Sequence, residues 1–284
     1  MADPVIMWFG RDLRLADNAA LAAAAAGGRP VLAVFVLDEI DSGTWAPGGA
    51  SRWWLHHSLR ALEESLHAVG SRLILRRGKT VDILLSIAAE AGAPAIHFTR
   101  GYEPHAAHLE QVLNQTGGKA GVEVRRFPGS LLHEPESLQN RSGQPFRVFT
   151  PFWRALLAKE RPRALGPAPR QLERPKHWPR SDNLDDWQLV PRKPDWAGGL
   201  RATWQPGEAG AAKRLTALVD NALASYATDR DRPDRPGTSM LSPHLHFGEV
   251  SPRQCWHAVT IAMERDPSLA SGAASFLREL GWRE

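Results

Sequence analysis

The first 128 residues are constrained most by their alternation of short apolar runs with helical patterns. Strands separated by helices of this length form right-handed β-α-β units, and their parallel sheet is covered by helices on both faces. We therefore predict a doubly wound, five-stranded, parallel α/β sheet, a Rossmann-like domain, over residues 1–128. The five predicted strands are residues 5–9, 31–37, 73–75, 95–99 and 122–127.

The predicted helices of this domain follow from apolar spacing and capping signals. We expect a helix over residues 14–26 that begins near Asp17, and another over residues 104–114. Ser51 and Thr80 are the expected N-caps of the two helices between them. Leucines at 55, 59, 62 and 66 lie on one face of the helix that follows Ser51.

The turn after the first strand limits the kind of ligand this domain takes. It reads Gly10-Arg11-Asp12-Leu13-Arg14 and lacks the Gly-x-Gly-x-x-Gly pattern, which disfavours a dinucleotide-binding Rossmann domain. Ligands of open parallel sheets still lie beyond the carboxyl ends of the strands. The candidates that directly follow strands are Arg11, Asp12, Asp38, Arg100, Tyr102 and Glu103. The alternative is that these residues are solvated loop charges.

Residues 129–207 lose this periodicity. Proline, arginine, aspartate and isolated tryptophans dominate residues 161–206, and we expect a helix only over residues 151–159. A structureless stretch of this length is unusual inside a compact domain, so we predict a connector that runs over the surface between two domains. Acidic residues and prolines interrupt the arginines between Arg161 and Arg180, which disfavours a nucleic-acid patch there.

The chain becomes helical again from residue 208. One apolar face of the first predicted helix ends at Tyr226, and further helices are expected over residues 251–265 and 272–284. Cys255, the single cysteine, lies on an apolar helix face and is expected in the core, as suits a reducing cytosol.

Two successive helix starts mark the stretch 237–254. Ser242 before Pro243 is the pattern of an N-cap followed by proline at the first helical position, and Ser251 with Gln254 is a capping box. Gly248 suits the end of the short helix between them. Hydroxyls at Thr238, Ser239 and Ser242 beside free N–H groups suit an anion site for a phosphate, although ordinary helix capping by itself explains them on local grounds.

Four blocks taken together resemble the DNA photolyase/cryptochrome family, most closely its class I cyclobutane pyrimidine dimer photolyases. They are Trp8-Phe9-Gly10-Arg11-Asp12-Leu13-Arg14-Leu15-Ala16-Asp17-Asn18, Arg147-Val148-Phe149-Thr150-Pro151-Phe152, the stretch 226–254, and Phe276-Leu277-Arg278-Glu279-Leu280-Gly281-Trp282-Arg283-Glu284. They follow the family's order from one end of the chain to the other. Photolyases continue past this Trp-Arg-Glu, so we expect residues 208–284 to be the first part of a helical FAD- and DNA-binding domain.

The resemblance implies two cofactors. One is FAD, and the other is an antenna chromophore, methenyltetrahydrofolate or 8-hydroxy-deazaflavin, held by the α/β domain. It implies a pterin-type contact at Glu103. The residues implied at the flavin are Tyr226, Thr238, Ser239, Met240, Leu241, Ser242 and Phe276.

The resemblance also implies a DNA site. Arg230 would reach a DNA phosphate, and Arg283 would serve either ligand. Glu279 would hydrogen-bond the base edge of the lesion, and Trp282 would stack on it; these two are the implied catalytic residues. Glu279, Trp282 and Arg283 have i, i+3 and i+4 spacing, which places them on one helix face.

The implied activity is light-driven DNA repair in the cytoplasm by a monomer that binds pyrimidine-dimer DNA and no membrane. An electron from the excited, reduced flavin would split the cyclobutane ring. Two alternatives stay open, namely a cryptochrome-type photoreceptor without repair and a non-catalytic nucleotide-binding fragment. The balance of 35 basic against 31 acidic residues permits nucleic-acid binding without demanding it.

For these 284 residues alone we expect defective repair. The roughly 75 residues after Glu208 bury little surface by themselves, and small domains are marginally stable for that reason. We therefore expect an α/β circular dichroism spectrum, a loosely ordered region after residue 208 with a frayed final helix, and little bound FAD.

Overall fold

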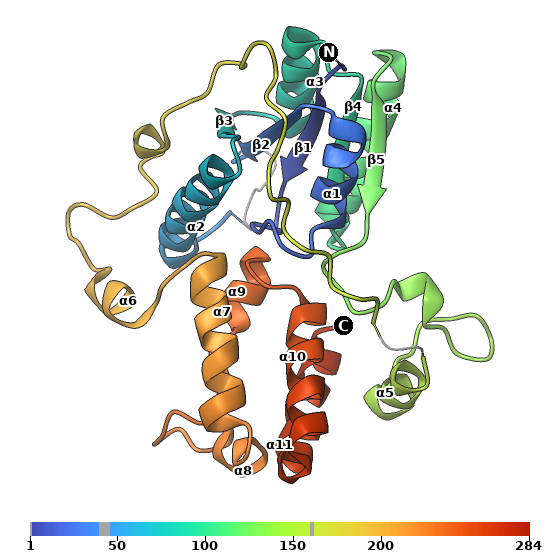
Figure 1. Ribbon diagram of the computed structural model, residues 1–284, viewed down its shortest axis with the longest axis vertical. Helices are drawn as coiled ribbons and strands as arrows, with labels where there is room; N and C mark the ends of the chain where they lie inside the picture. The colour runs from blue at the N-terminus through green and yellow to red at the C-terminus, as the bar shows by residue number, and fades with distance from the viewer. Residues whose placement is uncertain (1, 40–45, 160–161) are drawn as a thin grey trace. The chain divides into compact units, whose positions relative to one another are not determined.

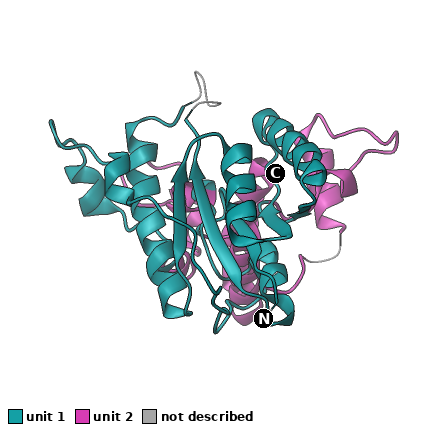
Figure 2. Ribbon diagram, turned by 90° about the horizontal axis from the view of Figure 1, so that it is seen from above, with its two compact units in different colours: residues 1–130, 166–210, 246–249 teal, residues 131–165, 211–245, 250–284 magenta. Residues whose placement is uncertain are grey.

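The computed structural model describes residues 2–39, 46–159 and 162–284 (Figure 1). Arg161, the first of the interrupted arginines, lies outside these residues. The chain divides into two compact units, shown in different colours in Figure 2. An α/β unit comprises residues 1–130, 166–210 and 246–249, and a helical unit comprises residues 131–165, 211–245 and 250–284.

The α/β unit contains one sheet of five parallel strands in the order β3-β2-β1-β4-β5. The chain starts in the middle of this sheet and winds outward in both directions, which confirms the predicted doubly wound fold. The strands are β1 (Val5–Phe9), β2 (Val31–Leu37), β3 (Leu73–Arg77), β4 (Ala95–Thr99) and β5 (Glu123–Phe127).

Helices cover both faces of the sheet because consecutive strand residues point to opposite sides. Met7 packs into a buried cluster with leucines of α1 (Ala19–Ala25) and α2 (Gly49–Ala68). Its neighbour Ile6 packs into a second cluster with residues of α3 (Thr80–Ala91) and α4 (Pro104–Lys119). Two separate layers of hydrophobic core result, one on each face of the sheet.

Three predicted helix starts are wrong by one to three residues. The helix expected to begin near Asp17 starts at Ala19, because the Asn18 side chain accepts a hydrogen bond from the Leu21 N–H at 3.0 Å and caps it. Thr80 lies inside α3 rather than before it. Asp38, far away in the sequence, accepts hydrogen bonds from the Thr80 N–H at 2.8 Å and from its hydroxyl at 3.0 Å. Ser51 also lies inside its helix, which begins at Gly49.

The second half of the predicted connector packs on the α/β unit. Leu172 and Trp187 are buried in the same cluster as Met7. Main-chain hydrogen bonds from Leu172 to Val69 (2.8 Å) and from Asp182 to Leu75 (2.7 Å) satisfy part of its irregular backbone. Apart from the short α6 (Gly198–Thr203) and a 3-10 turn, this stretch is ordered by packing rather than by regular structure.

A buried carboxylate joins three segments of the α/β unit. Glu249, which is 1% exposed, accepts hydrogen bonds from the Trp54 indole N–H (3.0 Å), the Ser58 hydroxyl and the Gly207 N–H (2.6 Å). Trp54 and Ser58 belong to α2, so this side chain ties that helix to residues 207 and 249. A buried charge is tolerated only when it is hydrogen-bonded in this way.

The helical unit has a hydrophobic core of its own, which includes Leu223, Cys255, Val259 and Leu280. The burial of Cys255 confirms the expectation for this residue. Its helices are α5 (Phe149–Leu157), most of α7 (Glu208–Ala217), α8 (Tyr226–Asp229), the start of α9 (Ser242–Phe247), α10 (Pro252–Arg265) and α11 (Ala270–Arg283). None of the helices formed by the described residues combines the length and the apolar character needed to cross a membrane.

Two helix predictions in this unit need correction. The helix that begins at Glu208 does not continue to Tyr226; a π-helical turn over Leu218–Ala222 interrupts it. Ser242 is already helical, because the carbonyl of the preceding Leu241 accepts the first helical hydrogen bond, from Leu245 at 2.9 Å. Other signals are confirmed: Ser251 and Gln254 form a capping box, and Gly248 ends α9 with a φ of +66°.

The end of the chain is ordered, contrary to the expected fraying. Helix α11 continues to Arg283, and the side chain of Glu284 is buried, with Oε2 accepting a hydrogen bond from the Leu132 N–H at 2.7 Å. The partner comes from residues 131–165, which add packing surface to the segment after residue 208. The segment after residue 208 therefore does not stand alone.

Candidate functional site

The loop over residues 237–242 has a backbone that few residues permit. A Cβ atom at Gly237 would lie 2.1 Å from the carbonyl oxygen of Asp229, so only glycine fits at that position. Met240 adopts a φ of +52°, in the left-handed region that non-glycine residues seldom occupy. Strained loop geometry of this kind is frequent at binding sites.

The hydroxyls of this loop have different surroundings. Thr238 and Ser242 are exposed, and neither hydroxyl has a hydrogen-bond partner within the part of the chain that the structure describes. The Ser239 side chain hydrogen-bonds Tyr226 and accepts from the Leu241 N–H at 3.3 Å. Leu241 is 1% exposed and packs into the hydrophobic core of the helical unit.

Tyr226 and Phe276 are brought together in the core of the helical unit. Their rings meet edge to face, with centroids 5.5 Å apart, and both side chains are buried. Burial raises the pKa of the Tyr226 hydroxyl above its usual value of 10.0, so the phenol is neutral at physiological pH.

Arg230 and Glu279 form an ion pair between the end of α8 and α11. The hydrogen bond from the guanidinium to Glu279 raises the pKa of Arg230 above its usual value. Both side chains are about one-third exposed (30% and 32%), so the pair contributes little to stability. Its effect is geometric, because Arg230 fixes the orientation of the Glu279 carboxylate.

Trp282 is 63% exposed and stacks on Phe149, with ring centroids 3.7 Å apart and planes 7° from parallel. Phe149 in turn stacks on Trp153 of the same helix. Gly281 allows this approach, since a Cβ there would lie 2.6 Å from the Trp153 ring. Next to Trp282, Arg283 places Nη2 3.5 Å from the carbonyl oxygen of Leu245, at the limit of a hydrogen bond.

Phe149 is the site residue that sequence reasoning missed. It belongs to one of the four resemblance blocks, but its stacking partner lies 133 positions away in the sequence. The only available signal was its presence in that block, and no local pattern connects it with Trp282.

The candidates of the α/β unit separate into two groups. Asp12, which is 1% exposed, accepts hydrogen bonds from the Gly10 N–H (2.8 Å) and the Thr99 hydroxyl (2.7 Å), and Asp38 caps α3. These two carboxylates stabilise the fold through these hydrogen bonds. The others remain accessible: Glu103 pairs with Arg11 at the surface, and the Arg100 guanidinium lies 4.9 Å from the Tyr102 ring centroid.

The fold of this chain is shared with solved proteins of the photolyase and cryptochrome class. The family model described as DNA photolyase matches residues 5–173. The chain therefore belongs to the DNA photolyase family.

Individual relatives agree with this assignment. The chain is 46% identical to a deoxyribodipyrimidine photo-lyase of Agrobacterium fabrum and 35% identical to Cryptochrome-1 of Arabidopsis thaliana, with 99% and 98% of this chain covered. It spans only 58% and 42% of those two proteins. A solved bacterial class III photolyase from Agrobacterium tumefaciens is similar over 100% of this chain and 58% of its own, with 44% identity and a TM-score of 0.92. That relative is described as class III, not as class I, the class that the four sequence blocks were expected to resemble most.

Proposed function

We propose that this protein takes part in light-dependent repair of cyclobutane pyrimidine dimers in the cytoplasm, as a monomer that binds damaged DNA. The observation that carries the proposal is the exposed Trp282 ring, which lies on the same helix, α11, as the oriented Glu279 carboxylate. An exposed indole plane suits stacking on an extruded base, because base–aromatic stacking is favourable for every base.

The residues present fit FAD as the cofactor. The exposed hydroxyls of Thr238 and Ser242, which have no partner among the described residues, suit the oxygens of a pyrophosphate. Tyr226 supports this loop through the hydrogen bond between its hydroxyl and the Ser239 side chain. When bound, FAD supplies the electron that opens the cyclobutane ring, and the protein orients the lesion and excludes water.

Each DNA-facing side chain has a separate role in this proposal. Trp282 stacks on the flipped lesion. Extruding a lesion from the duplex costs less free energy than extruding a well-stacked base. Glu279 hydrogen-bonds the lesion's base edge, and Arg230 holds that carboxylate in place while its exposed part reaches toward phosphate. The Arg283 guanidinium places positive charge beside either ligand, FAD or DNA. For the antenna chromophore, methenyltetrahydrofolate or 8-hydroxy-deazaflavin, Glu103 remains the proposed contact.

Replacing Thr238 and Ser242 together by alanine is expected to weaken FAD binding about tenfold or more. Two hydrogen bonds to a charged group are lost, each contributing about 1–3 kcal/mol. Because little FAD is expected to stay bound to these residues alone, a titration of the chain up to saturating FAD concentrations, followed by flavin fluorescence, measures the effect. Ser271→Ala, which removes another exposed hydroxyl of the helical unit, is the matched control. Unchanged FAD affinity in the double variant would contradict the assignment of this loop.

Trp282→Ala is expected to weaken binding to dimer-containing DNA by roughly one to two decades, because stacking contributes about 1–3 kcal/mol per base. Affinity for undamaged duplex DNA should hardly change, since phosphate contacts dominate it. Fluorescence anisotropy with matched damaged and undamaged duplexes tests both statements.

The control for this experiment is Trp196→Ala, a tryptophan of the other unit that is 48% exposed. Equal losses on damaged and undamaged DNA in Trp282→Ala would give Trp282 a structural role and remove the main support for repair.

A cryptochrome-type photoreceptor is the second candidate, favoured by the 35% identity to Cryptochrome-1. The two candidates differ in one product. Illumination of FAD-loaded protein with dimer-containing DNA restores intact pyrimidines if repair occurs and leaves the dimers unchanged if the protein only signals. A non-catalytic nucleotide-binding fragment would show no saturable binding in the FAD titration.

A further inference from the structure

Residues 137–159 of the helical unit carry four cations and no carboxylate. The cations are Arg141, Arg147, Arg154 and Lys159, and all four are exposed. Within the described residues, none of the three arginines forms an ion pair or a side-chain hydrogen bond. Most other arginines of the helical unit's surface loops are different: Arg230, Arg232 and Arg235 pair with carboxylates. As far as the described residues show, this segment therefore presents positive charge that no carboxylate neutralises.

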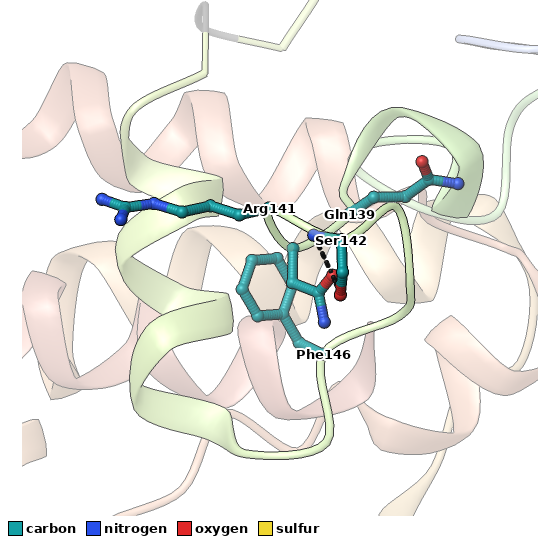
Figure 3. A pocket seen from close by; sticks show the side chains of 5 residues that line it. Gln139, Arg141, Ser142 and Phe146 are labelled. Atoms are coloured by element: carbon teal, nitrogen blue, oxygen red, sulfur yellow. Dashed lines mark hydrogen bonds between the residues drawn. The ribbon is translucent and has the colours of Figure 1, made fainter.

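A hollow of about 630 Å³ opens beside these arginines. It is lined by Gln139, Asn140, Arg141, Ser142 and Phe146. Figure 3 shows the Phe146 ring beside the turn that carries Ser142, with the Arg141 side chain extending to one side of it. A second hollow of about 430 Å³ shares Asn140, Ser142 and Phe146 with the first and continues to Arg147 and Pro151.

The turn around this hollow is ordered by one amide group. The Asn140 Oδ1 atom accepts hydrogen bonds from the Ser142 N–H (2.9 Å), the Ser142 hydroxyl (2.7 Å) and the Gln144 N–H (3.0 Å). Such an ordered turn loses little conformational entropy when a ligand binds, which favours affinity.

Aromatic rings connect the hollow with Trp282. Phe146 lies 6.2 Å from Phe152, Phe152 lies 6.2 Å from Phe149, and Phe149 stacks on Trp282 at 3.7 Å, all between ring centroids. Each of these phenylalanines is half-buried, so each is anchored in the unit and still partly open to solvent. Aromatic planes interleaved with unpaired arginines are the pattern of single-strand nucleic-acid binding surfaces.

We propose that Arg141, Phe146, Arg147, Phe149 and Trp282, here called the strand surface, bind an unpaired DNA strand. A base stacks on Phe146 in the hollow, and Arg141 and Arg147 contact the phosphates on its two sides. The inference rests on the proposed function only in one respect, namely that the flipped lesion lies at Trp282 and its flanking nucleotides follow the rings toward Phe146. A second copy of this chain is the less suitable occupant, because three unpaired arginines would face one another or an apolar surface.

The test uses a fluorescently labelled, undamaged, single-stranded oligothymidylate. Phe146→Leu keeps the apolar volume beside Phe152 but removes the aromatic plane, and it is expected to weaken binding about tenfold. Arg141→Ala with Arg147→Ala is expected to reduce the slope of log affinity against log salt concentration by about 1.4, since each phosphate contact on a single strand contributes about 0.7.

The matched control is Arg265→Ala with Arg278→Ala, which removes two exposed arginines of the same unit outside the strand surface. Circular dichroism melting curves that match the unaltered chain verify that each variant is folded. A control effect as large as that of the strand-surface pair would overturn the inference, as would unchanged binding in Phe146→Leu. Concentration-dependent self-association that the variants abolish would assign the surface to a second copy instead.

Failure of this inference is distinguishable from failure of the proposed function. Phe146→Leu, and Arg141→Ala with Arg147→Ala, should weaken damaged and undamaged single strands by the same factor and leave the preference for dimers intact. If the unaltered chain shows no preference for dimers, the repair proposal fails, while the strand surface is still tested by the undamaged strand.

Discussion

Glu249→Ala is expected to destabilise the α/β unit by about 3–5 kcal/mol, because three buried donors lose their acceptor. The indole N–H of Trp54, the hydroxyl of Ser58 and the N–H of Gly207 all donate to this carboxylate. Residue 249 is 1% exposed, so water does not replace the missing acceptor without entering the core. Few single substitutions reach this magnitude.

Thermal unfolding followed by circular dichroism measures this effect. Glu249→Gln keeps one carbonyl oxygen as acceptor and should lose less stability than Glu249→Ala. Glu64→Ala removes an exposed carboxylate from the same helix, α2, and should change the free energy of unfolding by no more than about 0.5 kcal/mol. A melting temperature of Glu249→Ala that matches Glu64→Ala would show that the carboxylate does not hold these segments together.

The stability of the helical unit is expected to fall as the pH rises from about 4.5 to about 7, because burial raises the pKa of Glu284 from 4.5 to about 7. The Arg283 guanidinium and the N–H groups of Leu132 and His133 act in the opposite direction, and Glu134 adds to the increase. His133 is itself partly desolvated, which lowers its pKa, so at neutral pH it brings no positive charge to Glu284.

The sign follows from proton binding in the two states. Between these pH values the unfolded chain has lost the proton of Glu284 while the folded chain keeps it, so the folded state is disfavoured as the pH rises. Below pH 4.5 both states are protonated and the contribution is constant. At about 1.4 kcal/mol per pKa unit, the loss of stability amounts to about 3 kcal/mol.

Glu284→Gln is the variant that isolates this effect. It keeps the shape and the hydrogen bond to Leu132 but does not ionise, so its free energy of unfolding should be higher above pH 7 and should lose this part of the pH dependence. Urea denaturation at pH 5 and pH 8 measures the difference. A pH dependence that is identical in Glu284→Gln and in the unaltered chain would show that Glu284 ionises normally in the folded protein.

The sequence by itself determined the five-stranded sheet of the α/β unit and the helices that cover it. Five apolar runs and the helical spacing of residues such as Leu55, Leu59 and Leu62 were sufficient to predict a doubly wound parallel sheet, because periodicity and crossover handedness are local rules. Helix caps whose partners lie within a few residues of each other were also predicted correctly from the sequence. Examples are the capping box of Ser251 with Gln254 and the helix end at Gly248. The four ordered blocks led to the family, which the similarity over residues 5–173 confirmed.

Tertiary structure decided what depended on partners far apart in the chain. Asp38 caps α3 from the end of another strand, and Leu172 of the connector fills the core of the α/β unit. The sequence brought Glu279, Trp282 and Arg283 to one helix face, but it did not pair Glu279 with Arg230 or stack Trp282 on Phe149. A local sequence pattern reflects interactions within one turn or one strand. The contacts named here join residues that are tens of positions or more apart, and they form only when folding brings distant segments together. No short stretch of the sequence therefore contains both partners.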